Sequence, residues 1–319
     1  MRAVVITRYG KPAEVLQVQE VERPVPADHQ VLLKVHAASL NVVDQAPVSG
    51  GIIPRLAGAG LLRPKQKFVG TDVAGEVVAV GPAVTRFQPG DEVFGATSGS
   101  CAEYALAREK SLVAKPANIT FKEGAATPVA ATSALQGLRK GGIAPGQKVL
   151  IHGSSGAVGP FAVQIAKAFG AEVSAVCSSR NVENSRRLGA DEVIDYTTTD
   201  FASLGKRYDL ILAVNGNRPP AVYRNALTPQ GRCVVVGGKI PQILQALLFG
   251  PFLSEKQGRQ VGFMGIASIN RADLEFLAEL LAAEKVKPLI ERVYPLEQTA
   301  EAMGYLLEGH AQGKLVVAT

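Results

Sequence analysis

Residues 148–170 read KVLIHGSSGAVGPFAVQIAKAFG, in which a short apolar run, a glycine-spaced turn and a helix-like segment follow one another. The apolar run is typical of a buried strand, and the last segment closes at Gly170, as helices often do. Free backbone N–H groups at the start of such a helix bind an anion without any basic side chain. The stretch therefore predicts a phosphate-binding turn.

The spacing of this turn is close to the dinucleotide-binding pattern G-x-G-x-x-G. Ser154, Gly156 and Gly159 occupy the three positions, and Gly153 stands just before the first. Gly156 would let the backbone approach a pyrophosphate, and Gly159 would let the helix pack closely on the strand. A plain connecting turn is the alternative. We expect the cofactor to bind at Ser155, Gly156, Ala157, Val158 and Gly159.

Strand-like and helix-like segments alternate around this turn. Strand-like sequence recurs at 172–177, 192–196, 208–214 and 233–238, and helix-like sequence at 121–142 and 181–189. This alternation predicts a parallel sheet with crossover helices. Residues 1–118 instead show short Val-rich strands broken by Gly and Pro.

The C-terminal residues return to a mixed pattern. An amphipathic helix over 270–286 precedes two strand-like segments, 289–296 and 314–319, which flank a helix over 297–309. We expect these strands to rejoin the N-terminal β region. The predicted domains are therefore 1–118 completed by 286–319, with 119–285 inserted between them.

Composition limits the function classes. The 319 residues are 47% apolar, and no apolar run approaches the ~20 residues that a membrane span needs. Together with an N-terminus that lacks a long apolar stretch, this favours a cytoplasmic protein. The charge of +6 and pI near 9.2 fit a basic enzyme; without Trp or a run of five basic residues, they do not favour nucleic-acid binding.

The end of the second predicted strand reads AVCSSRNVE over 175–183. NAD-binding folds place Asp or Glu there for the ribose 2′-hydroxyl, but this chain has Cys177, followed by Ser178, Ser179 and Arg180. Two hydroxyls and a guanidinium suit a 2′-phosphate, which a carboxylate would repel. The segment favours NADPH over NADH, although Arg180 as a solvated loop residue is the alternative.

Four motifs in order resemble the medium-chain dehydrogenase/reductase superfamily, and most closely its zinc-independent quinone oxidoreductase branch. They lie at 69–95, 125–138, 148–173 and 186–196, and the likeness extends to GHAQGKLVV at 309–317. The resemblance implies an α/β protein with a GroES-like β-barrel catalytic domain and a Rossmann dinucleotide-binding domain. It also implies a homodimer formed through the strand at 259–266.

Zinc-containing members differ from this chain at their ligand positions. Where they have a Cys after VHAAS, this chain has Leu40-Asn41, and their GHE motif corresponds to Gly70-Thr71-Asp72. The four His and three Cys residues lie apart, without the spacing of a zinc site. We expect no metal, and no disulfide framework.

The resemblance suggests three catalytic residues: Asn41 and Asp44 in SLNVVD, and Thr132 in VAATSAL. A turn-forming Asn with a capping Asp, and a small helix-packing Thr, are the alternatives. It also suggests cofactor contacts, each with a purely structural alternative, at Tyr196, Gly237, Gly238, Phe263 and Lys314.

Without a zinc ion the expected chemistry is hydride transfer from NADPH to an electrophilic acceptor. Small hydrophobic quinones and α,β-unsaturated carbonyls both qualify. Alcohol/carbonyl redox on the same scaffold, and a non-enzymatic NADPH-binding protein, remain open. Two apolar segments punctuated by Gly and Pro, 45–67 and 241–258, are expected to be irregular or briefly helical; they suit an apolar lid, a partner surface or a core cover.

Overall fold

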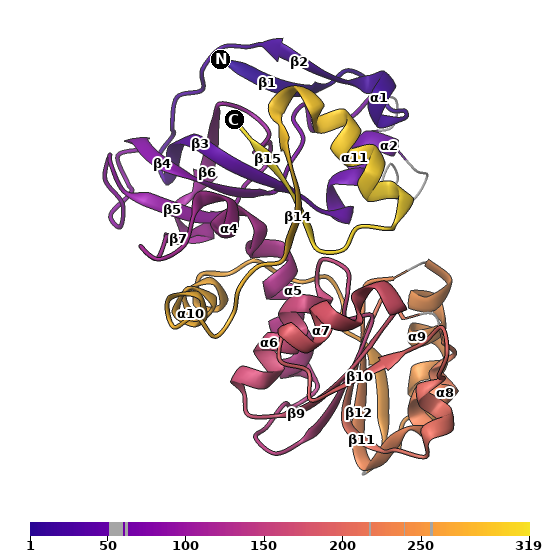
Figure 1. The fold of residues 1–319 in the computed structure, drawn as a ribbon. Helices are drawn as coiled ribbons and strands as arrows, with labels where there is room; N and C mark the ends of the chain where they lie inside the picture. Colours follow the sequence, from indigo (N-terminus) through magenta and orange to yellow (C-terminus); the bar gives the residue numbers. More distant parts are fainter. Residues whose placement is uncertain (51–59, 61–62, 217, 239, 256–257) are drawn as a thin grey trace. The chain divides into compact units, whose positions relative to one another are not determined.

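The computed structural model describes residues 1–50, 60, 63–216, 218–238, 240–255 and 258–319. The chain divides into two compact units (Figure 1). One comprises residues 1–129, 269–282 and 288–319, and the other 130–268 and 283–287. The domain limits inferred from the sequence, 118/119 and 285/286, stay a prediction.

The first unit is built on a seven-stranded sheet of order β14-β15-β3-β4-β5-β7, with β6 pairing to β3. The strands are β3 (Gln30–Leu40), β4 (Asp72–Val80), β5 (Glu92–Ala96), β6 (Tyr104–Arg108), β7 (Leu112–Ala114), β14 (Ile290–Pro295) and β15 (Lys314–Ala318). β15 pairs antiparallel with β3, and β14 parallel with β15. This confirms that the C-terminal strands rejoin the N-terminal β region.

Smaller elements complete this unit. β1 (Arg2–Ile6) and β2 (Leu16–Glu20) form a separate antiparallel pair. The helices are α1 (Pro12–Val15), α2 (Gln45–Ser49), α4 (Phe121–Ala126), α10 (Arg271–Ala282) and α11 (Thr299–Glu308). The expected helix over 121–142 is two helices, because Pro128 begins α5 (Pro128–Lys140) and lacks the N–H that a continuous helix needs.

The second unit contains a six-stranded parallel sheet of order β10-β9-β8-β11-β12-β13. Its strands are β8 (Lys148–His152), β9 (Glu172–Cys177), β10 (Glu192–Asp195), β11 (Tyr208–Val214), β12 (Leu227–Val236) and β13 (Gln260–Phe263). Counted along the chain, the spatial order is 3-2-1-4-5-6, that of a Rossmann fold. The parallel sheet confirms the expected α/β class.

Crossover helices cover both faces of this sheet. α6 (Gly159–Ala168) and α7 (Val182–Arg187) lie on one face, and α8 (Pro220–Asn225) and α9 (Ile240–Leu253) on the other (Figure 1). Successive strands are added on one side of β8 up to β10 and on its other side from β11 onward, so the order of the strands reverses between β8 and β11. Ligands of such sheets bind at this switch point, beyond the carboxyl ends of the strands.

Helix α9 corrects the expectation of irregular or briefly helical structure over 241–258. Its buried positions are Gln242, Ala246 and Gly250, one turn apart, and Gly250 comes close to the β13 main chain. Large apolar side chains point outward and are 49–87% exposed: Leu244, Leu247, Leu248, Phe249 and Phe252. Much of the other segment, 45–67, lies outside the described residues.

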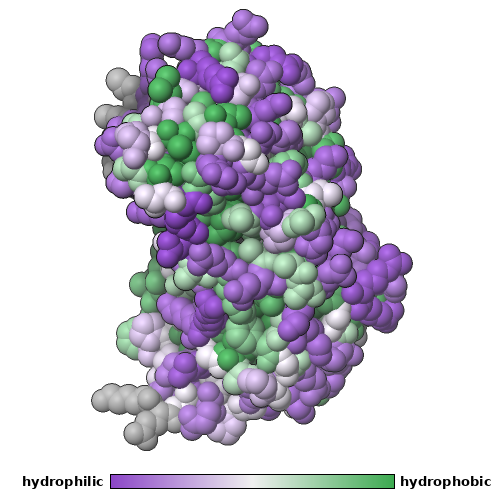
Figure 2. Space-filling model, turned by 90° about the vertical axis from the view of Figure 1, so that its left-hand side faces the viewer, coloured by the Kyte–Doolittle hydropathy of each residue, from purple (hydrophilic) through white to green (hydrophobic). Residues whose placement is uncertain are grey.

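The face drawn in Figure 2 is mostly hydrophilic, with hydrophobic residues in separate areas between polar ones. Within the described chain, no helix is both long enough and apolar enough to span a bilayer.

Candidate functional site

The glycine-rich turn between β8 and α6 lies at the carboxyl end of β8, at the switch point of the sheet. Gly153 has φ +93°, and the amides of Gly153 and Ser154 donate to the Val176 carbonyl at 3.1 Å. A Cβ at Gly159 would lie 2.2 Å from the Gly153 carbonyl oxygen, whereas one at Gly156 would meet no atom within 4 Å. Gly159 thus permits close helix–strand packing, and Gly156 leaves room for a pyrophosphate.

Ser154 replaces the first glycine of the pattern without leaving its hydroxyl unpaired. It is fully buried; its Oγ donates to the Val176 carbonyl at 3.3 Å and lies 3.0 Å from Ser185 Oγ. Ser185 Oγ donates in turn to Cys177 Sγ at 3.6 Å. This network fixes the turn against the end of β9 and the middle of α7.

Ser178, Ser179 and Arg180 follow β9, at the position where a ribose 2′ substituent is expected. Ser178 Oγ accepts a hydrogen bond from Asn181 Nδ2 at 3.1 Å, and Ser179 Oγ lies 2.9 Å from Thr197 Oγ1. Arg180 is exposed. The fold therefore brings these three predicted residues together at one end of the sheet.

A carboxylate that the sequence reasoning missed lies beside them. Asp195 ends β10 and pairs with Cys177 in the sheet register. Hydrogen bonds from Ser179 and Thr197 lower the pKa of Asp195, so this half-buried side chain is ionised at neutral pH. The pairing of β10 with β9 places Asp195 there. The sequence separation between Asp195 and Ser179 does not indicate that the two residues are close.

The carboxyl ends of β11 and β12 lie on the other side of the switch point. Asn215 follows β11 with φ +54°, a left-handed conformation that Asn tolerates better than most residues. Gly237 and Gly238 follow β12 with φ +66° and +109°. A Cβ at Gly238 would lie 3.7 Å from Asn215 Cα, so the two turns are adjacent. Sequence reasoning selected the glycines but not Asn215.

Three further predicted residues of this unit have different environments. Phe263 ends β13 and packs, half-buried, against the sheet core, and its carbonyl accepts from Lys140 Nζ at 3.1 Å. Thr132 on α5 is fully buried, and among the described atoms its hydroxyl has no hydrogen-bond partner. Tyr196, just after β10, is 59% exposed. A bound cofactor would satisfy an orphaned hydroxyl such as that of Thr132.

The remaining predicted residues, Asn41, Asp44 and Lys314, form a buried polar cluster in the first unit. The Lys314 ammonium donates to Asn41 Oδ1 and to the Leu40 carbonyl, and lies 3.3 Å from Asp72 Oδ2. Asn41 Nδ2 donates to Asp72 Oδ2 at 2.9 Å. The fold thus brings Asn41 and Lys314 into direct contact across β3 and β15, and Lys314 is 1% exposed.

Asp44 completes this cluster at the turn after β3. Its Oδ2 accepts from the main-chain N–H of Asn41 at 2.7 Å, and its Oδ1 accepts from Thr71 Oγ1 at 2.5 Å. Thr71 is half-buried, so it connects the buried carboxyl with the surface of the unit. The bond to the Asn41 amide is the capping interaction named as the structural alternative for Asp44.

Burial dominates the electrostatics of the two carboxyls. It raises the pKa of Asp44 to about 6, against the opposing hydrogen bond from Thr71. Burial also raises the pKa of Asp72, while the Lys314 charge opposes that shift. One ammonium therefore faces two buried carboxyls, and burial disfavours the ionised form of both.

Sequence reasoning used Thr71 and Asp72 only as the counterpart of a zinc-ligand motif. Their place in the cluster follows from β4 pairing with β3, which sets Asp72 opposite Ser39. Among the described residues, no group of three or more His, Cys, Asp or Glu side chains could hold a metal ion.

Two of the histidines have structural partners. His36 stacks on Phe121 with ring centroids 4.3 Å apart. His152 Nδ1 lies 2.9 Å from the Tyr223 hydroxyl, and burial lowers the pKa of His152 to about 4. His152 is therefore neutral at physiological pH and supports the end of β8 beside the glycine turn.

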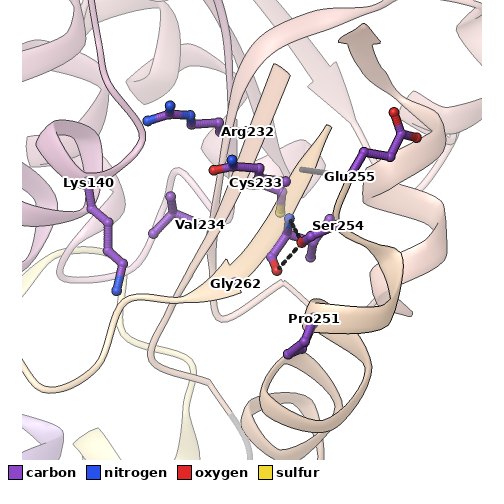
Figure 3. Close-up of a pocket in the computed structure, with 10 residues that line it drawn as sticks. Lys140, Arg232, Cys233, Val234, Pro251, Ser254, Glu255 and Gly262 are labelled. Carbon is purple, nitrogen blue, oxygen red and sulfur yellow. Dashed lines mark hydrogen bonds between the residues drawn. The ribbon is translucent and has the colours of Figure 1, made fainter. Parts of the chain in front are cut away.

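A pocket of about 390 Å³ opens beside the edge strand β13 (Figure 3). Lys140, Arg232 and Glu255 supply its charged lining, and Ser254 Oγ bonds to the main chain of Val261. Arg232, in the middle of β12, pairs with Gln260, the first residue of β13, so the pocket lies away from the carboxyl ends of the strands. None of the predicted site residues lines this pocket.

Two protein-family models match the chain. The model for the alcohol dehydrogenase GroES-like domain matches residues 27–133, and that for the zinc-binding dehydrogenase matches residues 188–317. The segments compared above with the zinc-ligand motifs, Leu40-Asn41 and Gly70-Thr71-Asp72, both lie in the first match.

Known proteins resemble the chain over almost its whole length. A chloroplastic quinone-oxidoreductase homolog of Spinacia oleracea is 35% identical, with 99% of this chain and 98% of that protein covered. An NADPH-dependent alkenal/one oxidoreductase of Arabidopsis thaliana is 33% identical, with 99% and 79% covered. The solved quinone oxidoreductase of Coxiella burnetii has a TM-score of 0.86 at 29% identity, with 100% and 99% covered.

Proposed function

We propose that this chain, which belongs to the quinone oxidoreductase-like branch of the medium-chain dehydrogenase/reductase superfamily, is an oxidoreductase that transfers hydride from NADPH to a quinone or an α,β-unsaturated carbonyl. The observation that carries the proposal is the glycine turn at the switch point of a 3-2-1-4-5-6 sheet, with open space at Gly156. The named activities of its relatives support the acceptor class.

The residues of the second unit fit a dinucleotide. The main chain from Ser155 to Gly159 would hold the pyrophosphate, and the turn at Gly237-Gly238 would approach the nicotinamide ribose. The buried Thr132 hydroxyl would gain a partner from the cofactor. When bound, the nicotinamide supplies the hydride, and the protein contributes position and electrostatics.

We assign NADPH as the preferred cofactor because of the residues after β9. Ser178, Ser179 and Arg180 offer two hydroxyls and a guanidinium to a 2′-phosphate. Asp195 opposes this preference, since its ionised carboxylate is hydrogen-bonded to Ser179. Arg180 would then supply the main positive charge that offsets Asp195.

The buried cluster would handle the acceptor oxygen and the proton. Lys314 and Asp72 hold the side-chain amide of Asn41 in one orientation. A fixed orientation suits a residue that positions a carbonyl or ribose oxygen. Reduction of a quinone or enone consumes one hydride and one proton. Asp44 holds a proton at its carboxyl in mildly acidic solution, and the Thr71 hydroxyl bonded to it offers a path to the surface.

The assembly proposed is a homodimer. β13 is the edge strand of the parallel sheet, and the exposed apolar side chains of α9 belong to the helix that packs against it. An unpaired sheet edge next to an apolar surface favours association. The three cysteines are buried free thiols, which fits a reducing compartment, and we propose the cytoplasm.

Steady-state kinetics test the proposed function. The purified protein would be mixed with NADPH and one acceptor at a time, and the absorbance of NADPH would be followed. The panel would contain quinones, α,β-unsaturated carbonyls, simple ketones and simple aldehydes. We expect NADPH to be oxidised with quinones or α,β-unsaturated carbonyls. Tight NADPH binding without turnover of any acceptor would instead support a non-enzymatic protein.

A further inference from the structure

The amide of Gln242, in the first turn of α9, is buried beside the glycine turn that follows β12. The residue is 8% exposed, and its Nε2 has no hydrogen-bond partner among the described residues. Its Oε1 lies 2.4 Å from the position that a Cβ would take at Gly238, so the side chain folds back onto that turn. Gly237 and Gly238 are themselves exposed.

A buried N–H group without a partner is costly, because it has lost its bonds to water and gained none from the protein. Gln242 also sits at the start of a 14-residue helix, where main-chain N–H groups lack partners within the helix. Both features indicate a polar ligand at the turn.

The topology identifies which part of a dinucleotide reaches this turn. The glycine turn after β8 takes the pyrophosphate, and the 2′ end lies after β9, on one side of β8. β11 and β12 lie on the other side. The nicotinamide half therefore extends over the ends of β11 and β12, where Asn215, Gly238 and Gln242 lie.

We propose that Gln242 binds the nicotinamide carboxamide, with its N–H donating to the carboxamide oxygen and its oxygen accepting from the carboxamide N–H. This assignment rests on the proposed function and adds a residue that orients the nicotinamide ring. An amide is suited to the task because the carboxamide offers one donor and one acceptor side by side. The absent side chain at Gly238 lets the two amides approach.

The test compares Gln242→Leu with Gln245→Leu, an exposed glutamine on the same helix. Fluorescence titration would give the dissociation constant of NADPH, and calorimetry that of 2′,5′-ADP, which lacks the nicotinamide. We expect Gln242→Leu to weaken NADPH about tenfold, as for one or two lost hydrogen bonds, and to leave 2′,5′-ADP within about twofold. Gln245→Leu should change neither.

Thermal unfolding without cofactor separates this role from a structural one. Removal of an unpaired buried amide should leave the melting temperature of Gln242→Leu equal to or above that of the wild type. Equal weakening of NADPH and 2′,5′-ADP, unchanged binding of both, or a lower melting temperature without cofactor would overturn the assignment. If the wild-type protein bound no NADPH, the proposed function itself would fail.

Discussion

At the scale of single residues, Arg180 is the side chain on which the proposed preference for NADPH depends. Arg180 is exposed and follows Ser178 and Ser179. The Ser179 hydroxyl donates a hydrogen bond to the ionised Asp195. A 2′-phosphate at this position gains a charge-assisted hydrogen bond only if Arg180 turns toward it.

Replacement of Arg180 by Ala is expected to raise the KM for NADPH about tenfold and to leave the KM for NADH within about twofold, because NADH lacks the 2′-phosphate. Arg187→Ala is the matched control, since Arg187 is exposed on α7 and pairs with Glu183 at 3.2 Å. Equal KM values for the two cofactors, unchanged in Arg180→Ala, would contradict the NADPH assignment.

Asp44 gives the chain a stability that depends on pH. Its pKa is about 6 when folded and 3.8 ordinarily, so the folded state binds the proton more tightly. That contribution is fully present below pH 4 and is lost as pH rises through 6.

Relative to Asp44→Asn, the free energy of unfolding of the wild type should therefore fall by about 2 kcal/mol between pH 4 and pH 7. Urea unfolding of both proteins across this range measures the difference. Asp72 and Lys314 are present in both, so the difference measures Asp44 together with its coupling to these two groups. Parallel profiles would show that Asp44 is not perturbed by burial.

At the scale of elements, the glycine turn offers a pair of substitutions that separates binding from folding. A Cβ at Gly159 would collide with the main chain of Gly153 and Ser154, whereas one at Gly156 would meet only open space. The two glycines are three residues apart, but packing excludes a side chain only at Gly159.

Gly159→Ala is expected to lower the free energy of unfolding by about 1–3 kcal/mol, because α6 must move away from β8. Gly156→Ala should change it by less than about 0.5 kcal/mol and weaken NADPH roughly tenfold. Thermal unfolding and cofactor titration on both variants provide the comparison. Loss of stability in Gly156→Ala, or normal NADPH binding, would count against the turn as a phosphate site.

Elements were predictable from the sequence where local chemistry decides them. The glycines after β8 specify a turn, and the nearly continuous apolar runs of β8, β9 and β11 specify buried strands. The break between α4 and α5 depends on Pro128 and could have been anticipated. Helix α9 could not, because its small buried residues and large exposed ones reverse the usual amphipathic pattern.

At the scale of the whole molecule, the candidate site was predictable in its parts but not in its connections. Asn41, Asp44 and Lys314 were selected by resemblance, yet their contact depends on β15 pairing with β3. Asp72 and Asp195 join their clusters only through strand pairing. Sequence spacing carries no information on such pairings between distant strands.

The proposed homodimer makes a prediction at this scale. Sedimentation or light scattering at micromolar concentration should give about twice the chain mass of 33.5 kDa. Phe252→Glu, which adds charge to the most exposed side chain of the α9 apolar set, should shift the protein toward the monomer. A monomer at all concentrations would assign the α9 surface another role.

The most direct measurement of the central claim is the fate of the hydride. The protein would be incubated with an α,β-unsaturated aldehyde and NADPH deuterated at C4, with each stereoisomer in turn, and the product analysed by mass spectrometry. A quinone would be followed in parallel as one hydroquinone formed per NADPH consumed. The proposed hydride transfer predicts deuterium at the β-carbon of a saturated aldehyde from one stereoisomer, or stoichiometric hydroquinone. Deuterium at the carbonyl carbon of an allylic alcohol, or no reduced product from either acceptor, would contradict it.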